Sequence, residues 1–433
     1  MEPIISEHFR NRQPSAIRQA QIAYSKRQDS VKAINTAIGN VTLPMHPSMR
    51  KRMDELNIDS PFTKGVVKYT PTVGLEETNQ AFLNILKSSG FSTEGLFSQV
   101  TAGGSHAMEL MILGCCGPAG SDERPLLLID AAYTNYVAMA KRLGRMIISV
   151  QRNLDESGKF SMTDLEEVKS VIEKEKPSAI VVIPYDNPTG HFYDHKSLVE
   201  IGKLAVSHNL WLVSDEAYRE LHYTEHDVSS VWGLTEEEVP GITGRRISIE
   251  TASKVWNACG LRIGALITDN EAYHKSSVAE DTANLCTNAI GQFIFGAIAH
   301  ESAEDLQIWY KKQRDYYYPI LSGVVNNLRA KFPGIIVSNP DASLYCVVDV
   351  RNIVPEGFDS MEFVMWCAET GKVEISGEEM TLLVSPMAGF YNVIDNNPGK
   401  TQMRIAAVAS PEEMQKVPEL FVKLLEEYLK ELL

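Results

Sequence analysis

The sequence lacks the apolar runs that mark membrane and secreted proteins. No stretch approaches the ~18 consecutive apolar residues of a transmembrane helix. The N-terminal segment MEPIISEHFRNRQPS has no apolar core of signal-peptide length. We therefore expect a soluble, cytoplasmic protein that does not bind a membrane.

Paired cysteines and internal repeats are also missing. The six cysteines lie in apolar or helical contexts without paired spacing, which favours buried free thiols over a disulfide framework. They are Cys115, Cys116, Cys259, Cys286, Cys346 and Cys367. No repeat or low-complexity tract indicates a solenoid or a disordered linker.

Positive charge is scarce, since 41 Lys and Arg face 56 Asp and Glu, for a formal net charge of -15. No basic patch stands out. This balance argues against a nucleic-acid partner held through phosphate contacts.

The chain length of 433 residues exceeds one compact core, so we expect two domains. Strand and helix patterns alternate to about residue 268, which predicts an α/β fold with a mostly parallel sheet sandwiched by helices. We expect an N-terminal segment of the small domain at 1–60, a large domain at 61–304, a connecting helix at 305–331 and a small α+β domain at 332–433.

Polar residues follow several predicted strands, where ligands of such sheets bind. These residues are Gly103, Gly104, Ser105, Asp186, Asn187, Asp215, Tyr218 and Lys254. A lysine at a buried strand end is partly desolvated, which favours the neutral, nucleophilic amine. Lys254 is therefore a Schiff-base candidate, although an ordinary surface lysine is equally compatible with this stretch.

The Gly103-Gly104-Ser105 segment is expected to begin a helix. Backbone N–H groups there suit an anion such as phosphate, and helix capping by Ser105 is the simpler alternative. With His106 and Ala107 the segment also approximates the G-x-S-x-G nucleophile elbow, so a serine hydrolase that uses Ser105 is a distant alternative.

Two further patterns carry charge or metal-ligand chemistry. Asp215 is expected to be buried, so its carboxylate needs a cation, either a structural arginine or a protonated heterocycle. His222 to His226 matches H-x-x-E-H, but the residues after it are typical of a loop, and we expect no metal site.

Four motifs become specific only in combination. Asp-Asn187-Pro-Thr-Gly, Ser-Asp215-Glu-Ala-Tyr218, Ser-Lys254 with Gly-Leu-Arg262-Ile-Gly, and Met-Arg404-Ile-Ala follow one another along the chain. In order and approximate spacing the sequence resembles the class I/II, fold type I, pyridoxal-phosphate-dependent aminotransferases. The resemblance spans nearly the whole chain.

The resemblance implies a role for each ring-contacting residue. Lys254 would bind pyridoxal phosphate (PLP) covalently and shuttle a proton. Asp215 would pair with the pyridine nitrogen, and Asn187 and Tyr218 would bind the phenolic oxygen. Tyr133 would stack on the ring, with core packing as its alternative.

It also implies how phosphate is bound. Gly103, Gly104, Ser105, Thr251 and Arg262 would hold the phosphate group. Tyr69 resembles the tyrosine that reaches the phosphate from the neighbouring subunit, which implies a homodimer.

The implied reaction moves an amino group from an α-amino acid to a 2-oxo acid by a ping-pong mechanism. Arg404 would bind the substrate carboxylate, and Gly39 and Asn40 would close over it. A C–S β-lyase or other carbanion chemistry on the same fold is the alternative. The sequence does not identify the substrate, because no second arginine for a side-chain carboxylate can be recognised.

Overall fold

A seven-stranded sheet forms the larger part of the molecule. The computed structural model describes residues 3–121, 124–162 and 164–432. The strand order is β2-β8-β7-β6-β5-β3-β4, and β8 runs antiparallel to both of its neighbours whereas the other pairs are parallel. The strands are β2 (Phe97–Thr101), β3 (Leu126–Asp130), β4 (Ile147–Gln151), β5 (Ala179–Val182), β6 (Trp211–Asp215), β7 (Arg246–Thr251) and β8 (Gly264–Thr268).

Both faces of this sheet are buried. Alternate residues of one strand enter different apolar clusters, as Leu127 and Ile129 of β3 do on one face and Leu126 and Leu128 on the other. Burial on both faces explains why these strands are continuous apolar runs. The helices of this part are α4 (Glu76–Ser88), α5 (Gly104–Cys116), α6 (Asn135–Arg142), α7 (Leu165–Glu175), α8 (His195–Ser207), α9 (Glu271–Asp281) and α10 (Ala289–Gly296).

Two smaller sheets form the second part. One has the order β1-β12-β11 and the other β13-β14-β10-β9. Their strands are β1 (Lys32–Asn35), β9 (Ile336–Val337), β10 (Tyr345–Asp349), β11 (Val373–Ile375), β12 (Glu378–Leu383), β13 (Ser385–Pro386) and β14 (Gln402–Ala406). Because β1 pairs in parallel with β12, the N-terminal segment contributes to this part.

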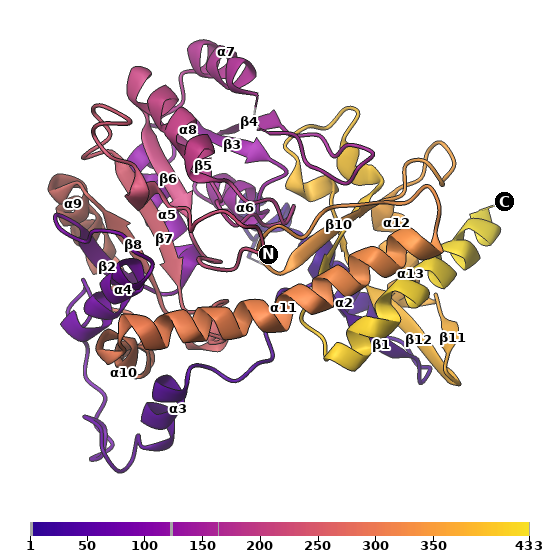
Figure 1. Cartoon of the computed structure of the whole chain (residues 1–433), viewed down its shortest axis with the longest axis horizontal. Helices are drawn as coiled ribbons and strands as arrows, with labels where there is room; N and C mark the ends of the chain where they lie inside the picture. The colour runs from indigo at the N-terminus through magenta and orange to yellow at the C-terminus, as the bar shows by residue number, and fades with distance from the viewer. Residues whose placement is uncertain (1–2, 122–123, 163, 433) are drawn as a thin grey trace.

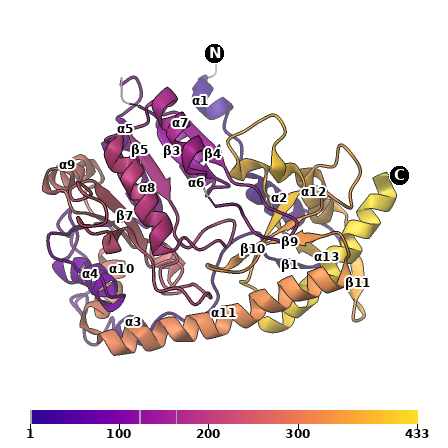
Figure 2. The same cartoon turned by 45° about the horizontal axis from the view of Figure 1, so that its top comes forward.

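A 29-residue helix, α11 (Ala303–Lys331), runs along both parts (Figures 1 and 2). It packs against α4 at one end and α13 at the other. The remaining helices are α1 (Glu7–Arg10), α2 (Ala16–Ser25), α3 (Pro47–Asp54), α12 (Ser360–Glu369) and α13 (Pro411–Leu432). The α/β architecture is confirmed, and the predicted domain boundaries remain predictions.

Several elements differ from the sequence prediction. The sequence from Val31 to Ile38 predicts a longer strand than β1, which ends at Asn35 because the chain turns there into the loop that carries Gly39. Helices α3, α9 and α10 and strands β11, β12 and β13 were not predicted. Strand β12 begins with two exposed glutamates, so its apolar run is too short to indicate a strand by itself.

Candidate active site

A cavity of about 260 Å³ lies where the carboxyl ends of the large sheet meet the smaller sheets. Most residues predicted from the sequence line it. They are Gly39, Gly104, Ser105, Tyr133, Asn187, Asp215, Tyr218, Thr251, Lys254, Arg262 and Arg404. Polar residues that follow several strands of the large sheet therefore meet in one cavity, whereas Asp186 is buried outside its lining in an ion pair with Arg152.

Lys254 follows β7 of the large sheet, and its side chain reaches the loop after β1 of the smaller part. Its Nζ donates a hydrogen bond to the backbone oxygen of Gly39. A Cβ added at Gly39 would overlap Tyr345 Oη and lie 3.3 Å from Lys254 Nζ. Glycine is thus required for this loop to approach the lysine.

Asp215 ends β6 and is buried. Its carboxylate accepts hydrogen bonds from Tyr136 Oη at 2.9 Å and from the Ala217 N–H at 3.2 Å, and both donors are neutral. Burial raises the pKa of Asp215 to about 6. A buried carboxylate with neutral donors on one side suits a protonated ring nitrogen on the other, so this position fits pyridoxal phosphate.

Arg404, on β14, also lines the cavity. Its Nη1 donates to Asn187 Oδ1 and its Nη2 to the Ala37 oxygen, each at 2.7 Å. Its Nε is buried without a hydrogen-bond partner among the described residues. Because these acceptors are neutral, the guanidinium retains its full charge for an anionic ligand.

Asn187 and the two tyrosines beside it form one polar group. Asn187 Nδ2 donates to Tyr218 Oη at 3.4 Å, and Tyr218 Oη lies 2.6 Å from Tyr345 Oη. Burial raises the pKa of Tyr218 well above its ordinary value, so the phenol stays protonated. These hydroxyl and amide groups suit an oxygen acceptor in the cavity.

The part of the cavity at the start of α5 has the features of an anion site. Gly103 precedes α5 with φ +78°, and a Cβ there would collide with the Arg262 guanidinium. Arg262 Nη1 donates to the Cys259 oxygen at 3.0 Å, and Thr251 Oγ1 lies 2.8 Å from Ser253 Oγ. A helix N-terminus, an arginine and hydroxyls together fit a phosphate group.

Of three further predicted residues, Tyr133 lines the cavity and the other two lie outside its lining. Tyr133 lines the cavity, burial raises its pKa to about 12, and its hydroxyl accepts from Asn135 Nδ2 at 2.9 Å. Asn40 lies at the rim, where its Oδ1 accepts from Cys259 Sγ at 3.2 Å. Tyr69 is 79% exposed and lies outside the cavity lining.

The histidines of the nucleophile-elbow and H-x-x-E-H motifs make contacts that serve neither a serine hydrolase nor a metal site. His106 Nδ1 accepts from the Ala102 N–H at 3.1 Å and its Nε2 lies 3.1 Å from Asp281 Oδ1, so this imidazole is not directed at Ser105. His222 stacks on Phe192 with centroids 4.9 Å apart. Over the described part of the chain, no group of three or more His, Cys, Asp or Glu side chains could hold a metal, and no helix could span a membrane.

Among the residues not predicted from the sequence, Arg18 lines the cavity, and Tyr136 lies outside its lining but contacts Asp215. Tyr136 bonds Asp215 from α6, a contact between residues 79 positions apart that no local pattern announces. Arg18, exposed on α2, lines the cavity and donates from Nη1 to Gln21 Oε1 at 2.8 Å. Tyr345 and Phe390 also line the cavity.

Comparisons with known proteins agree with this geometry. The family model of aminotransferase class I and II matches residues 31–417. The aspartate aminotransferase of Musicola paradisiaca is 24% identical over 66% of this chain and 68% of its own length. That of Sulfolobus acidocaldarius is 26% identical over 82% of this chain and 84% of its own length.

Solved structures give the same fold. A double mutant of Thermus thermophilus aspartate aminotransferase superposes with a TM-score of 0.79 at 20% identity, over 98% of this chain and all of that one. An alanine aminotransferase from Pyrococcus furiosus gives 0.78 at 20% identity, with coverage of 98% and 100%. The chain therefore belongs to the class I and II aminotransferases, which transfer amino groups with pyridoxal phosphate.

Proposed function

We propose that this cavity is the cofactor and substrate site, with Lys254 as the catalytic residue. The observation that carries the proposal is the presence of Lys254, buried Asp215 and the two arginines Arg262 and Arg404 in one cavity. Pyridoxal phosphate, when bound, supplies an electron sink for the negative charge left when a proton leaves the substrate α-carbon. The chain's own groups must hold that ring and move that proton.

Each group has a task that its contacts support. Asp215 holds the proton of the ring nitrogen, while Asn187 and Tyr218 offer donors to the phenolic oxygen and Tyr133 covers the ring. The phosphate is held by Arg262 with the remaining predicted anion contacts, which are Gly103, Gly104, Ser105 and Thr251. The Lys254 amine, once free, accepts and returns the proton as a general base.

Arg404 is the proposed partner of the substrate α-carboxylate, which would replace its neutral acceptors. Gly39 and Asn40 lie on the loop that closes over this group. Lys254 already contacts that loop through the Gly39 oxygen. Substrate binding would thereby draw the two parts of the molecule together.

A homodimer is the proposed active species. Tyr69 is 79% exposed, and the neighbouring Val66 and Val67 are 52% and 55% exposed. An exposed apolar segment of this kind suits burial against a second copy, which would bring Tyr69 to the partner's phosphate site. Full activity in a demonstrated monomer would contradict this assignment.

We further propose an acidic amino donor. The curated relatives quoted above are aspartate aminotransferases, and Arg18 at the cavity wall offers a second cation for a side-chain carboxylate. The cytoplasm is the proposed location, since Cys115, Cys259, Cys286, Cys346 and Cys367 are free thiols. Amino acid metabolism is the corresponding process.

The test begins with the purified protein, which should be yellow. Borohydride reduction should attach the cofactor irreversibly to Lys254, and Lys254→Ala should abolish transamination. Arg404→Ala should raise the KM for amino donors by a factor of at least about 10, as loss of a charged hydrogen bond implies. An unchanged KM would contradict the carboxylate role.

A donor panel tests the substrate class. Aspartate and glutamate should exceed alanine and kynurenine in kcat/KM, and Arg18→Ala should remove the preference while leaving alanine unaffected. Parallel measurement of pyruvate and ammonia from a cysteine conjugate tests the β-lyase alternative. Elimination faster than transamination would reject the proposed reaction.

A further inference from the structure

A buried cluster of charged residues lies behind the proposed cofactor site. Glu216 follows Asp215 at the end of β6, and Glu250 precedes Thr251 on β7. Asp215 and Thr251 line the active-site cavity, whereas Glu216, Glu250 and Arg219 line a small cavity behind it. The same two strand ends therefore present groups to both places.

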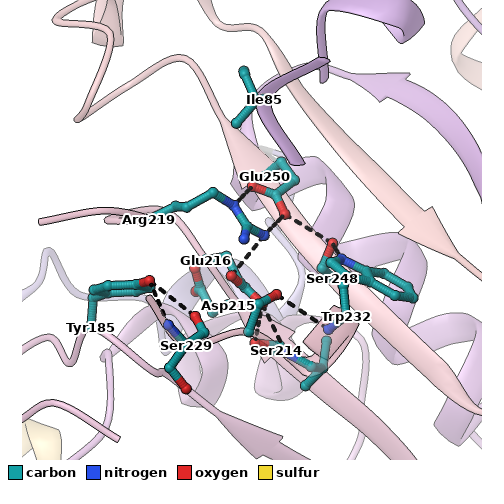
Figure 3. Close-up of polar contacts among 12 residues, drawn as sticks. Ile85, Tyr185, Ser214, Asp215, Glu216, Arg219, Ser229, Trp232, Ser248 and Glu250 are labelled. Atoms are coloured by element: carbon teal, nitrogen blue, oxygen red, sulfur yellow. Dashed lines mark hydrogen bonds and ion pairs between the residues drawn. The ribbon is translucent and has the colours of Figure 1, made fainter. Parts of the chain in front are cut away.

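One guanidinium serves two carboxylates in this cluster. Arg219 Nη2 lies 2.7 Å from Glu216 Oε2 and 2.7 Å from Glu250 Oε1, as Figure 3 shows. The three side chains are 0% to 4% exposed. With both carboxylates ionised the cluster would carry one net negative charge in the interior, which is strongly unfavourable.

The two carboxylates have different hydrogen-bond partners. Glu216 Oε1 accepts from Ser214 Oγ at 2.9 Å, from Ser230 Oγ at 2.6 Å and from the Val231 N–H at 3.3 Å. Glu250 accepts hydrogen bonds from Ser248 Oγ at 3.0 Å and from Arg219 Nη2 and Nε at 2.7 and 3.4 Å. Two buried carboxylates therefore share one guanidinium, and the cluster is neutral only when one of them carries a proton.

The other elements around Glu250 bring no compensating charge. Helix α11 contributes Tyr310, whose hydroxyl lies 3.1 Å from Ser88 Oγ, and α4 contributes Phe82 and Ile85. Across the ladder, β8 places Ala265 opposite Glu250. Among the described residues that line this cavity, Arg219 is the one cation.

One further ion pair lies near this cavity, and it does not involve Arg219. Glu220 forms its own ion pair with Arg314 at 3.1 Å, so it does not draw Arg219 away. Burial, with the charge of Glu216, raises the pKa of Glu250 to about 7. This direction agrees with the excess negative charge of the buried cluster.

We propose that Glu250 is a positioning residue for the cofactor site, which carries a proton below neutral pH and there favours the negative charge on Asp215. Glu216 and Arg219 then form a neutral pair. An ionised Glu250 would add a second negative charge behind Asp215 and oppose its ionisation. The inference rests on the role of Asp215 proposed above.

Infrared spectroscopy of the holoenzyme tests the proton directly. Between about pH 5 and pH 9, the wild type should lose a protonated carboxyl band with a midpoint near pH 7. Glu250→Gln, which keeps the size and hydrogen bonds of the side chain, should lack this component. Glu379→Gln, at an exposed ion pair, is the matched control and should retain it.

The result that overturns the proton assignment is a band that persists in Glu250→Gln, or its absence from the wild type below pH 7. Glu250→Asp keeps a titratable group and should keep a band with a shifted midpoint. It therefore tests the assignment even where Glu250→Gln folds poorly. This readout does not depend on transamination.

The visible spectrum of bound cofactor tests the positioning role. Wild type and Glu250→Gln should have the same spectrum below about pH 6, where Glu250 is protonated. At higher pH the wild type gains a negative charge, so its chromophore should lose its proton at higher pH than the variant does. Identical midpoints in the two proteins would overturn the positioning role. A wild type that gains no visible band with pyridoxal phosphate would instead contradict the cofactor site proposed above.

Discussion

Arg152 and Arg219 are both buried behind the active site, but Arg152 faces one carboxylate and Arg219 faces two. Arg152 pairs with Asp186 and also donates from Nη2 to the Ala131 oxygen at 3.0 Å. Arg219 bridges Glu216 and Glu250. The first pair is balanced in charge, whereas the second cluster can be balanced only by a proton.

The two clusters also hold different parts of the site. The Arg152 pair joins the segment after β3, which leads to Tyr133, to Asp186, which directly precedes Asn187. The Arg219 cluster joins the ends of β6 and β7 (Figure 3). A pair whose charges balance keeps the same contacts throughout the neutral pH range. A cluster whose charges do not balance makes part of the site sensitive to pH.

The largest effect should follow from Arg219→Leu, which strands two buried carboxylates. Breaking one buried pair costs about 3–5 kcal/mol, so we expect this variant to lose more than about 5 kcal/mol at pH 8. At pH 5 protonation of both glutamates should reduce the loss. Urea denaturation at the two pH values, with Arg142→Leu at an exposed ion pair as control, measures this.

Arg152→Leu should have a smaller effect, about 3–5 kcal/mol, because it strands only Asp186. The double variant Arg152→Leu/Asp186→Asn should recover most of that loss. Arg219→Leu/Glu250→Gln should recover only part of its loss, since Glu216 remains. Equal recovery of the free energy of unfolding in the two double variants would show that the two clusters do not differ in charge balance.

The pH dependence of stability should separate the clusters next. The folded-state pKa of Glu250, about 7, exceeds its ordinary 4.5, so the folded protein binds more protons between these values. Its contribution to the free energy of unfolding is therefore complete below pH 4.5 and falls as pH rises towards 7. Denaturant titrations should show this decline in the wild type and a flatter profile in Glu250→Gln.

The smallest effect should come from Tyr136→Phe, which removes one donor from Asp215 between the two clusters. Loss of a hydrogen bond to a charged group is worth about 1.5–3 kcal/mol. Since this bond lowers the pKa of Asp215, its removal should raise that pKa and weaken cofactor binding about tenfold or more. Equilibrium dialysis measures the affinity, and Tyr24→Phe, remote on α2, is a matched control.

The sequence allowed the prediction of features that depend on neighbours along the chain. The apolar strands and the polar residues that end them, among them Asp215 and Lys254, follow local patterns and were found in one cavity. Contacts set by packing could not be predicted. Tyr136 meets Asp215 across 79 residues and Arg152 meets Asp186 across 34, and both contacts depend on how helices and strands pack in space.

Charge within an apolar strand was an overlooked signal. Glu250 interrupts the run Ile-Ser-Ile-Glu-Thr, where a buried carboxylate requires a partner. The requirement can be stated from the sequence, but the partner cannot, because Arg219 lies 31 residues away by numbering and reaches Glu250 only through the pairing of β6 with β7. Register, not composition, decides such clusters.

The amide of Asn187 has a single orientation that satisfies both of its neighbours. Its oxygen accepts from Arg404, so its NH₂ group is left for Tyr218 and for an oxygen in the cavity. A carboxylate that captures Arg404 would withdraw the donor that holds this amide in place. Occupancy of the substrate position would thereby change the hydrogen bonding of the Asn187 amide and, through it, that of Tyr218.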